Sequence, residues 1–401
     1  MKWRLVNIPE VLFFQEGPGV RKWQFTDSGV KLLNVGNLND NQLNLSTTSI
    51  YISNEEAFGK YSHFLVEEGD LLIGCSGIVV DKFHQKMAFA QKSDLPLCMN
   101  TSTMRFRCLD ERLDIRFFMY VLQSKIFTNQ LRKLITGSAQ LNFGPSHIKQ
   151  IQIPLPPLPV QQKIAAILDA ADAYRQKTKA LIEKYDQLAQ SLFLEMFGDP
   201  VKNEKGWEVT TIRNVVREVK YGTSAKAGDT GSFPYLRMNN ITYEGYMDYS
   251  DLKYIDVRDE EKPKFSVKRG DILFNRTNSK DLVGKTGLIT TDSEMIIAGY
   301  LIRVRVNTDM NPYFVWGHLN SNWAKLILKN MCKNIIGMAN INAQELQEIK
   351  ILKPPRDIQD LFAKCIDKLF DQKTILSKNL EKTNQLFQSL LQKAFNGDLV
   401  S

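Results

Sequence analysis

The chain contains two copies of one sequence pattern, separated by about 200 residues. Residues 66–73 (VEEGDLLI) return as residues 267–274 (VKRGDILF), and residues 137–142 (GSAQLN) return as residues 337–342 (GMANIN). Further matches follow in the same order: 151–157 with 349–355, and 190–199 with 388–398. Chance can supply one such pair but not a collinear series, so the sequence predicts a duplicated structural unit.

Each copy begins with a mixed region and then becomes helical. Residues 1–110 and 205–310 contain short apolar runs broken by Gly, Asn and Asp, which is typical of short strands and turns. Apolar residues take up helical spacing near 115–124 and near 312–321. These patterns predict two globular domains in which helices and strands are mixed.

Proline-rich stretches separate each globular domain from a long helix. Residues 154–159 and 354–355 are rich in proline, which cannot continue a strand ladder or a helix interior. The predicted organisation is therefore a first globular domain, a long helix, a second globular domain and a second long helix, at 1–158, 159–199, 200–356 and 357–401.

The long helices carry apolar residues at heptad spacing. In the first helix, one row comprises Ile164, Ala171, Thr178, Tyr185 and Leu192, and a second comprises Ile167, Tyr174, Leu181 and Leu188. The last helix has the row Phe362, Leu369, Leu376, Thr383 and Leu390, accompanied by Ile366, Leu380 and Phe387. Such rows are typical of a coiled-coil seam.

The other long helix is the simplest partner for such a seam. A helix over 160–197 is about 55 Å long at 1.5 Å per residue, and neither globular domain is large enough to cover it throughout. We expect an α+β protein, with two mixed α/β domains joined by two long helices that form an antiparallel coiled coil. The alternative is that each helix packs on its own domain.

Composition indicates the compartment and the class of partner. The 401 residues carry a formal charge of +8 and a pI near 9.0, which favours a polyanionic partner. The five cysteines form no CxxC pair, and no leader or membrane-spanning segment is evident. We expect a cytoplasmic protein with no membrane association.

Several fragments resemble catalytic motifs but lack essential parts. Residues 279–286 (SKDLVGKT) resemble a phosphate-binding loop, yet Ser279 replaces the first glycine and a strand-like segment follows. Residues 311–314 (NPYF) resemble a methyltransferase motif, but a helix cap explains them equally well. We expect no catalytic residues.

The remaining acidic and histidine residues suggest no metal site. Asp199 with Glu218 and Lys220 resembles a metal-nuclease set only faintly. The histidines are scattered without metal-ligand spacing, at positions 63, 84, 147 and 318. We therefore expect no metal.

Polar and basic residues follow each Gly-Asp strand, and their identities differ between the copies. Such residues read base edges and phosphates in DNA complexes, although a solvated loop has the same composition. The asparagines after each glycine could also cap the next turn. The candidate DNA-binding residues are Arg21, Lys22, Asn34, Asn37, Ser76, Lys82, His84, Lys86, Gln140, Asn142, Lys220, Tyr221, Thr223, Lys226, Arg237, Asn239, Asn240, Arg276, Thr277, Asn278, Lys280, Asn340 and Asn342.

Three features together resemble the specificity subunit of type I restriction-modification systems. They are residues 32–38 (LLNVGNL), the two Gly-Asp strands, and residues 153–165 (IPLPPLPVQQKIA) at the entry to the first long helix. The resemblance covers essentially the whole chain, and the second copy of the helix entry, 353–359 (KPPRDIQ), is looser.

The resemblance implies a non-catalytic subunit whose two target-recognition domains each read one half of a bipartite DNA site. The long helices would set the spacing and dock two methyltransferase subunits, with restriction and translocase subunits joining the complex. S-adenosylmethionine, ATP and Mg would reside on those partners. The alternatives are a coiled-coil adaptor with protein-binding heads and the specificity part of a methyltransferase-only system.

Overall fold

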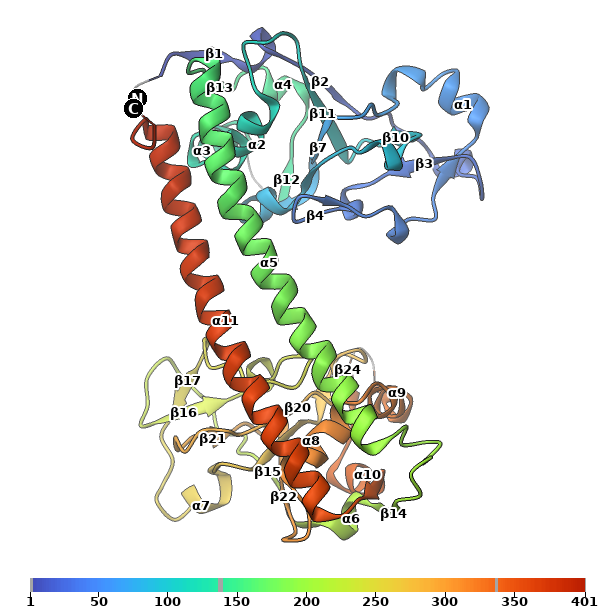
Figure 1. Cartoon of the computed structure of the whole chain (residues 1–401), viewed down its shortest axis with the longest axis vertical. Coiled ribbons are helices and arrows are strands. Elements are labelled where there is room, and N and C mark those ends of the chain that lie inside the picture. The colour runs from blue at the N-terminus through green and yellow to red at the C-terminus, as the bar shows by residue number, and fades with distance from the viewer. Residues whose placement is uncertain (1–2, 136–139, 336–337, 401) are drawn as a thin grey trace. The chain divides into compact units, whose positions relative to one another are not determined.

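The computed structural model describes residues 3–135, 140–335 and 338–400 (Figure 1). The chain forms two compact units: unit 1 comprises Met1–Lys177 and Leu380–Ser401, and unit 2 comprises Thr178–Asn379. Each unit therefore includes part of both long helices. The division into four consecutive segments stays a prediction, and the repeat residues at 137–139 and 337 lie outside the described chain.

Unit 1 is built around a four-stranded sheet of order β2-β11-β7-β9, with a three-stranded sheet β10-β3-β6 beside it and the pairs β1-β13, β12-β8 and β4-β5. Its strands are β1 (Leu5–Asn7), β2 (Leu12–Glu16), β3 (Val30–Leu33), β4 (Leu38–Asn39), β5 (Gln42–Leu43), β6 (Tyr51–Ile52), β7 (Leu71–Gly74), β8 (Ser76–Val79), β9 (Met87–Phe89), β10 (Leu97–Met99), β11 (Thr103–Cys108), β12 (Gln140–Asn142) and β13 (Gln152–Pro154). Its helices are α1 (Asn54–Phe58), α2 (Ile115–Gln123), α3 (Lys125–Leu134), α4 (Pro145–Ile148) and the first part of α5 (Leu158–Phe197).

Unit 2 repeats this topology, with sheets of order β15-β22-β18-β20, β17-β16-β21 and β19-β24-β23 and the pair β14-β25. Its strands are β14 (Glu208–Thr211), β15 (Val216–Tyr221), β16 (Phe233–Leu236), β17 (Lys253–Ile255), β18 (Ile272–Asn275), β19 (Thr277–Asn278), β20 (Thr286–Leu288), β21 (Ile296–Ile297), β22 (Leu301–Val306), β23 (Lys333–Ile335), β24 (Met338–Asn340) and β25 (Lys350–Lys353). Its helices are α6 (Ile212–Val215), α7 (Lys262–Phe265), α8 (Pro312–Asn320), α9 (Asn322–Met331), α10 (Ala343–Gln347) and the first part of α11 (Arg356–Asn396). The predicted duplication is confirmed.

The repeated Gly-Asp pair stabilises the turn before the central strand of each unit. Gly69 and Gly270 have φ angles of +84° and +86°, a conformation that glycine adopts without a Cβ clash. The following aspartate accepts a hydrogen bond from the main chain three residues earlier, at 2.9 Å in both units. The aspartate carboxylates are buried and pair with arginines on the neighbouring strand, β11 or β22. The Gly-Asp repeat is therefore a structural device of the fold.

A buried glutamine fixes the entry to each long helix. The Gln161 side chain accepts a hydrogen bond from the Asp114 amide at 2.9 Å and donates to the carbonyl of Pro156 at 2.7 Å. Gln359 accepts from the Asn311 amide at 2.7 Å and donates to Pro354 at 2.8 Å. The second helix entry therefore keeps both hydrogen bonds of this glutamine, although its sequence matches the first entry only loosely.

The two long helices pack against each other within each unit and run antiparallel. In unit 2, Asp186 of α5 pairs with Lys373 of α11. About two turns further along α5, Phe193 contacts Phe362 of α11, with 5.8 Å between the ring centroids. In unit 1, the Arg175 Nε atom donates to Asn384 at 2.9 Å. The ribbons of α5 and α11 run in opposite directions, as predicted (Figure 1).

The second predicted heptad row of α5 is wrong as a seam. Tyr174, Leu181 and Leu188 are 56%, 42% and 50% exposed. The packed face instead follows steps of four and three residues from Ile164 and Leu168, which are buried. Steps of four and three residues add up to seven, so the first predicted row, which begins at Ile164, lies on this packed face. Its companion row begins at Leu168, one residue after the predicted Ile167.

The catalytic-looking fragments have structural roles. Residues 286–288 form strand β20, so no helix follows the lysine-rich loop. Asn311 caps α8 by accepting a hydrogen bond from the Tyr313 amide, with Pro312 in the first turn. Among the described residues we find neither a cluster of potential metal ligands nor a helix with the length and hydropathy required to cross a bilayer.

Candidate nucleic-acid interface

Unit 2 brings several candidate residues together where the Gly-Asp strand leaves the central sheet. Strand β19 pairs with β24, which places Thr277 opposite Asn340 and Asn278 opposite Ala339. The Thr277 hydroxyl lies 3.4 Å from the Asn340 side-chain oxygen. These residues, with Arg276, form what we call the polar edge of unit 2.

Arg276 is held in place by an aromatic ring. Its guanidinium lies over the ring of Tyr221, 4.8 Å from the centroid, and the Tyr221 hydroxyl accepts a hydrogen bond from the Ala343 amide at 2.9 Å. The Arg276 Nε atom has no hydrogen-bond partner among the described residues. That atom is buried, so recognition would use the terminal nitrogens of the guanidinium, whose position over the ring suits bidentate contact with guanine or phosphate.

Unit 1 has an equivalent polar edge with different residues. Strand β8 pairs with β12, and the Asn142 side-chain oxygen accepts hydrogen bonds from the Ser76 hydroxyl and the Gly77 amide, both at 2.9 Å. Gln140 lies in the same strand, opposite Val79. Ser76 stands where unit 2 has Thr277, and Asn142 stands where it has Asn340. The polar edges differ at the flanking positions, where unit 1 has Cys75 and Gly77 and unit 2 has Arg276 and Asn278.

Two candidate asparagines are engaged within the fold. Asn37 and Asn240 are buried, and each side-chain oxygen accepts a hydrogen bond from the main chain three residues earlier. Their amide groups donate to main-chain carbonyls of the following loop. Both asparagines close a tight 3-10 turn, and their polar atoms have no freedom to reach a base.

Lys86 and Asn342 also have structural contacts. The Lys86 ammonium donates to the Leu38 carbonyl at 3.1 Å, and Lys285 makes the equivalent contact with the Ile241 carbonyl in unit 2. Asn342 caps helix α10 by accepting from the amides of Gln344 and Glu345. The capping alternative is therefore confirmed for Asn342.

Other candidates lie apart from the polar edges. In unit 2, Arg237 and Asn239 both donate to the carboxylate of Asp251, at 2.9 and 3.0 Å. Lys220 pairs with Glu218 at 2.8 Å, and the Thr223 hydroxyl accepts from the Ala225 amide at 3.2 Å. Lys226 is exposed.

In unit 1, Arg21 and Lys22 lie on an exposed turn beside Trp23, a large apolar side chain that is 80% exposed. Asn34 is half-buried and accepts from the Asn100 amide group at 2.9 Å. Lys82 is exposed and His84 half-buried, both in the turn that follows β8.

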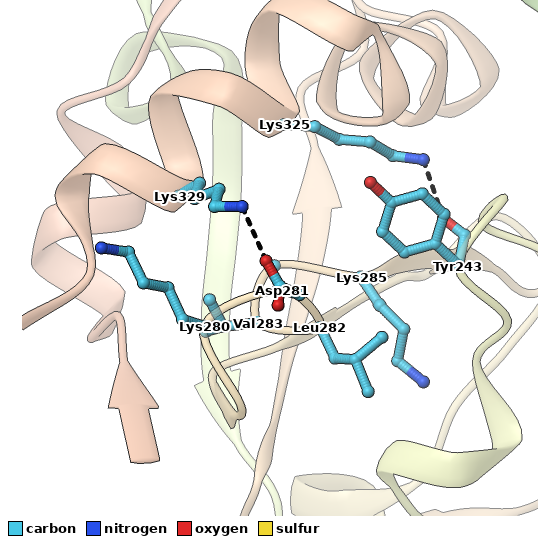
Figure 2. A pocket seen from close by; sticks show the side chains of 9 residues that line it. Tyr243, Lys280, Asp281, Leu282, Val283, Lys285, Lys325 and Lys329 are labelled. Atoms are coloured by element: carbon cyan, nitrogen blue, oxygen red, sulfur yellow. Dashed lines mark hydrogen bonds and ion pairs between the residues drawn. The ribbon is translucent and has the colours of Figure 1, made fainter. Parts of the chain in front are cut away.

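Sequence reasoning missed a lysine-lined hollow in unit 2. We call the lysine hollow the space bounded by Lys280, Asp281, Lys285, Lys325, Lys329, Tyr243 and the apolar residues between them, with a volume of about 210 Å³ (Figure 2). Lys325 and Lys329 are one turn apart on α9, and that spacing was the signal in the sequence.

The comparisons with known proteins identify the family. The model of the type I restriction modification DNA specificity domain matches residues 1–184 and 204–386. The chain belongs to this family. The two matched segments coincide with the two copies of the repeat.

Relatives of this specificity-domain protein include the specificity subunits of several type I restriction enzymes. The EcoKI subunit of Escherichia coli (strain K12) is 26% identical over 71% of this chain and 66% of its own length. The EcoBI subunit of Escherichia coli is 21% identical over 100% of this chain and 86% of its own length. The chain spans slightly less than two thirds of the EcoKI subunit.

Solved structures show the same fold. The S subunit of a type I restriction-modification system from M. genitalium is 16% identical, covers 98% of this chain and 96% of its own, and aligns with a TM-score of 0.56. A second chain, from a study of complex assembly and conformational transition of the type I R-M system, is 17% identical with a TM-score of 0.51, over 99% of this chain and 98% of its own.

Proposed function

We propose that this protein is the DNA-specificity subunit of a type I restriction-modification complex, in which each unit reads one half of a bipartite site. The observation that carries the proposal is the duplicated framework with unlike polar edges. Ser76 and Asn142 occupy in unit 1 the places of Thr277 and Asn340 in unit 2 and are similar to them. The residues on either side of the hydroxyl differ, because Cys75 and Gly77 in unit 1 stand where unit 2 has Arg276 and Asn278. Equal scaffolds with different donors and acceptors suit the recognition of two different sequences.

The framework explains how such a reader keeps its geometry. Buried aspartate–arginine pairs and glutamine-anchored helix entries hold the strands beneath each polar edge. The side chains that change between copies then project from a rigid base, as a binding site requires. Basic residues around the edges would contact phosphates and set orientation, while the edge residues would specify bases.

The helices fit a role in spacing and assembly. Tyr174, Leu181 and Leu188 form an exposed apolar row on α5 at seven-residue spacing. Exposed apolar rows of this kind are typical of surfaces that bind another protein. In this proposal it docks methyltransferase subunits, two per complex, through which restriction and translocase subunits would join.

The chain itself is proposed to be non-catalytic and to bind no cofactor. Asp199, Glu218 and Asn311 accept hydrogen bonds from main-chain or basic groups of unit 2 itself. S-adenosylmethionine, ATP and Mg would belong to the partner subunits.

Mapping of methylated bases in cells that carry this protein and its methyltransferase tests the proposal. We expect one bipartite motif in the wild type. The R276A/N340A variant should relax one half of that motif, and S76A/N142A should relax the other half. As a matched control, Asp229→Asn alters an exposed ion pair with Lys253 on unit 2 and should leave the motif unchanged.

Three outcomes would contradict the proposal in whole or in part. Variants of one unit that change both halves together would contradict the assignment of one half-site to each unit. If the chain binds its protein partners but binds no DNA even at low salt, it would instead be a coiled-coil adaptor with protein-binding heads. Methylation without cleavage in the same cells would assign the chain to a methyltransferase-only system.

A further inference from the structure

The lysine hollow carries more positive charge than its own residues balance. Four lysines line it, against one aspartate (Figure 2). Asp281 pairs with Lys329 at 2.7 Å, and the Lys325 ammonium donates to the Tyr243 carbonyl at 2.8 Å while lying 4.0 Å from the centre of its ring. Lys280 is exposed at the hollow, and the Lys285 ammonium donates to the carbonyls of Met238 and Ile241, which carry no net charge.

Burial makes this excess charge costly. Loss of water lowers the pKa of Lys285 and of Lys325, and the carboxylates nearby, Glu244 for both and Asp186 for Lys325, offset this only partly. Like charges one helical turn apart, as in Lys325 and Lys329, also repel each other. A bound anion would relieve both effects.

Unit 1 has a hollow at the equivalent place. It lies between α3 and the turn after β8, has a volume of about 460 Å³, and is lined by His84, Lys125, Thr128, Asn129 and Arg132 among others. Basic side chains thus recur where the loop after the Gly-Asp strand meets the second short helix. A basic hollow that is present in both units, although its residues differ, indicates that it serves the same function in each.

The volume of the lysine hollow and its place beside the polar edge indicate which anion it would bind. A volume of about 210 Å³ is below the roughly 300–1,000 Å³ typical of organic ligands, but it accommodates one phosphate group. Lys280 lies two residues beyond Asn278 of the polar edge of unit 2. Lysine delivers a point charge suited to phosphate.

We propose that the lysine hollow of unit 2 binds one backbone phosphate of duplex DNA and so fixes the position of the polar edge on its half-site. The inference rests on the proposed function. Base contacts alone do not fix the position of unit 2 along the duplex, whereas a phosphate bound beside them does.

The test compares variants of the full chain, assembled with its methyltransferase subunits, on a 30-base-pair duplex that carries the mapped site. In K280Q/K329Q the slope of log affinity against log salt should fall by about one, because the hollow holds one phosphate and each phosphate contact contributes about 0.9. Affinity at 0.15 M salt should fall by about fivefold by the same relation. The motif itself should not change.

Asp281→Asn should act in the opposite direction. It removes the carboxylate that pairs with Lys329, so binding should tighten by about fivefold and the salt slope should steepen. The control variant K264Q/K268Q removes two lysines on or near α7, which lies on the other side of unit 2 from α9 in Figure 1. It should match the wild type.

The possible failures are distinguishable. A wild type that does not prefer the mapped duplex over a scrambled one refutes the proposed function itself. A wild type with that preference, but with K280Q/K329Q equal to K264Q/K268Q, refutes only the phosphate site. Thermal stabilisation by millimolar inorganic phosphate or ATP that K280Q/K329Q abolishes, with an unchanged DNA salt slope, would assign the hollow to a free phosphate and overturn the proposal.

Discussion

The buried aspartates of the two Gly-Asp pairs should differ in how much each unit depends on them. In unit 1, Asp70 is the buried carboxylate beside Arg105 and Arg107, at 3.5 and 2.8 Å. In unit 2, Asp271 shares the equivalent arginines with Glu218, which lies 2.7 Å from Arg303 and 2.9 Å from Arg305. Phe13 takes the place of Glu218 in unit 1, and the Arg105 guanidinium lies over its ring.

The structure sets the magnitudes. Asp70→Asn leaves Arg105, whose side chain is almost fully buried, without a carboxylate, and breaking a buried ion pair costs about 3–5 kcal/mol. Asp271→Asn leaves Glu218 on both arginines, so the loss should be that of charged hydrogen bonds, about 1.5–3 kcal/mol. Removal of both carboxylates, in D271N/E218Q, should exceed the sum of the single losses by about 1–3 kcal/mol.

Hydrogen exchange resolved by peptide is the appropriate assay, because it reports the opening free energy of β11 and β22 separately within one chain. Asp229→Asn, at an exposed ion pair with Lys253, serves as the control and should cost no more than about 1 kcal/mol. Equal losses for Asp70→Asn and Asp271→Asn, or additive losses in D271N/E218Q, would refute the reasoning.

Three further outcomes are expected. Hydrogen bonds from Lys220 and Arg303 outweigh desolvation and lower the pKa of Glu218 to about 2, so unit 2 should lose stability as the pH falls from about 4.5 toward 2, and urea unfolding of Glu218→Gln should show a flatter acid dependence. Removal of seven residues from the middle of each long helix shortens each by about 10.5 Å, so methylation mapping should find the half-sites about three base pairs closer; an unchanged gap would contradict the spacing role. Changing Tyr174, Leu181 and Leu188 to serine should leave unfolding within about 1 kcal/mol, since these side chains are exposed, but should abolish co-sedimentation with methyltransferase subunits; retained assembly would place the dock elsewhere.

The duplication could be predicted from the collinear matches between the copies, and the positions of the helices could be predicted because their signals are local. Proline ends the strand segment before α5 and α11, and the glycines at 198 and 397, with φ near +79° and +87°, follow the last helical turns. The buried strand β7 is a continuous apolar run that can be recognised by eye. Local chemistry was sufficient for these elements.

The candidate site could be predicted only in part, because surface and capping positions use the same polar residues. Asn37 and Asn340 are alike in sequence, yet one is buried in a turn and the other lies at a polar edge. Lys86 belongs to the loop framework through its contact with Leu38. Only the fold shows which polar atoms are already engaged. The heptad assignment failed on Leu181 for another reason: two neighbouring rows both repeat every seven residues, and only the packed structure shows that the row from Leu168 is the buried one.

The split composition of unit 1 has a consequence for synthesis. Unit 2 is one continuous segment, whereas the core of unit 1 includes Phe387, Leu391 and Phe395 near the end of the chain. At about 5–20 residues per second, the ribosome needs roughly 10–40 s to make the intervening 200 or so residues. Throughout that time the apolar surface of unit 1 that later packs against the end of α11 stays exposed to solvent. The unit that is begun first is therefore completed last, and its exposed surface is where a chaperone or an early partner would act.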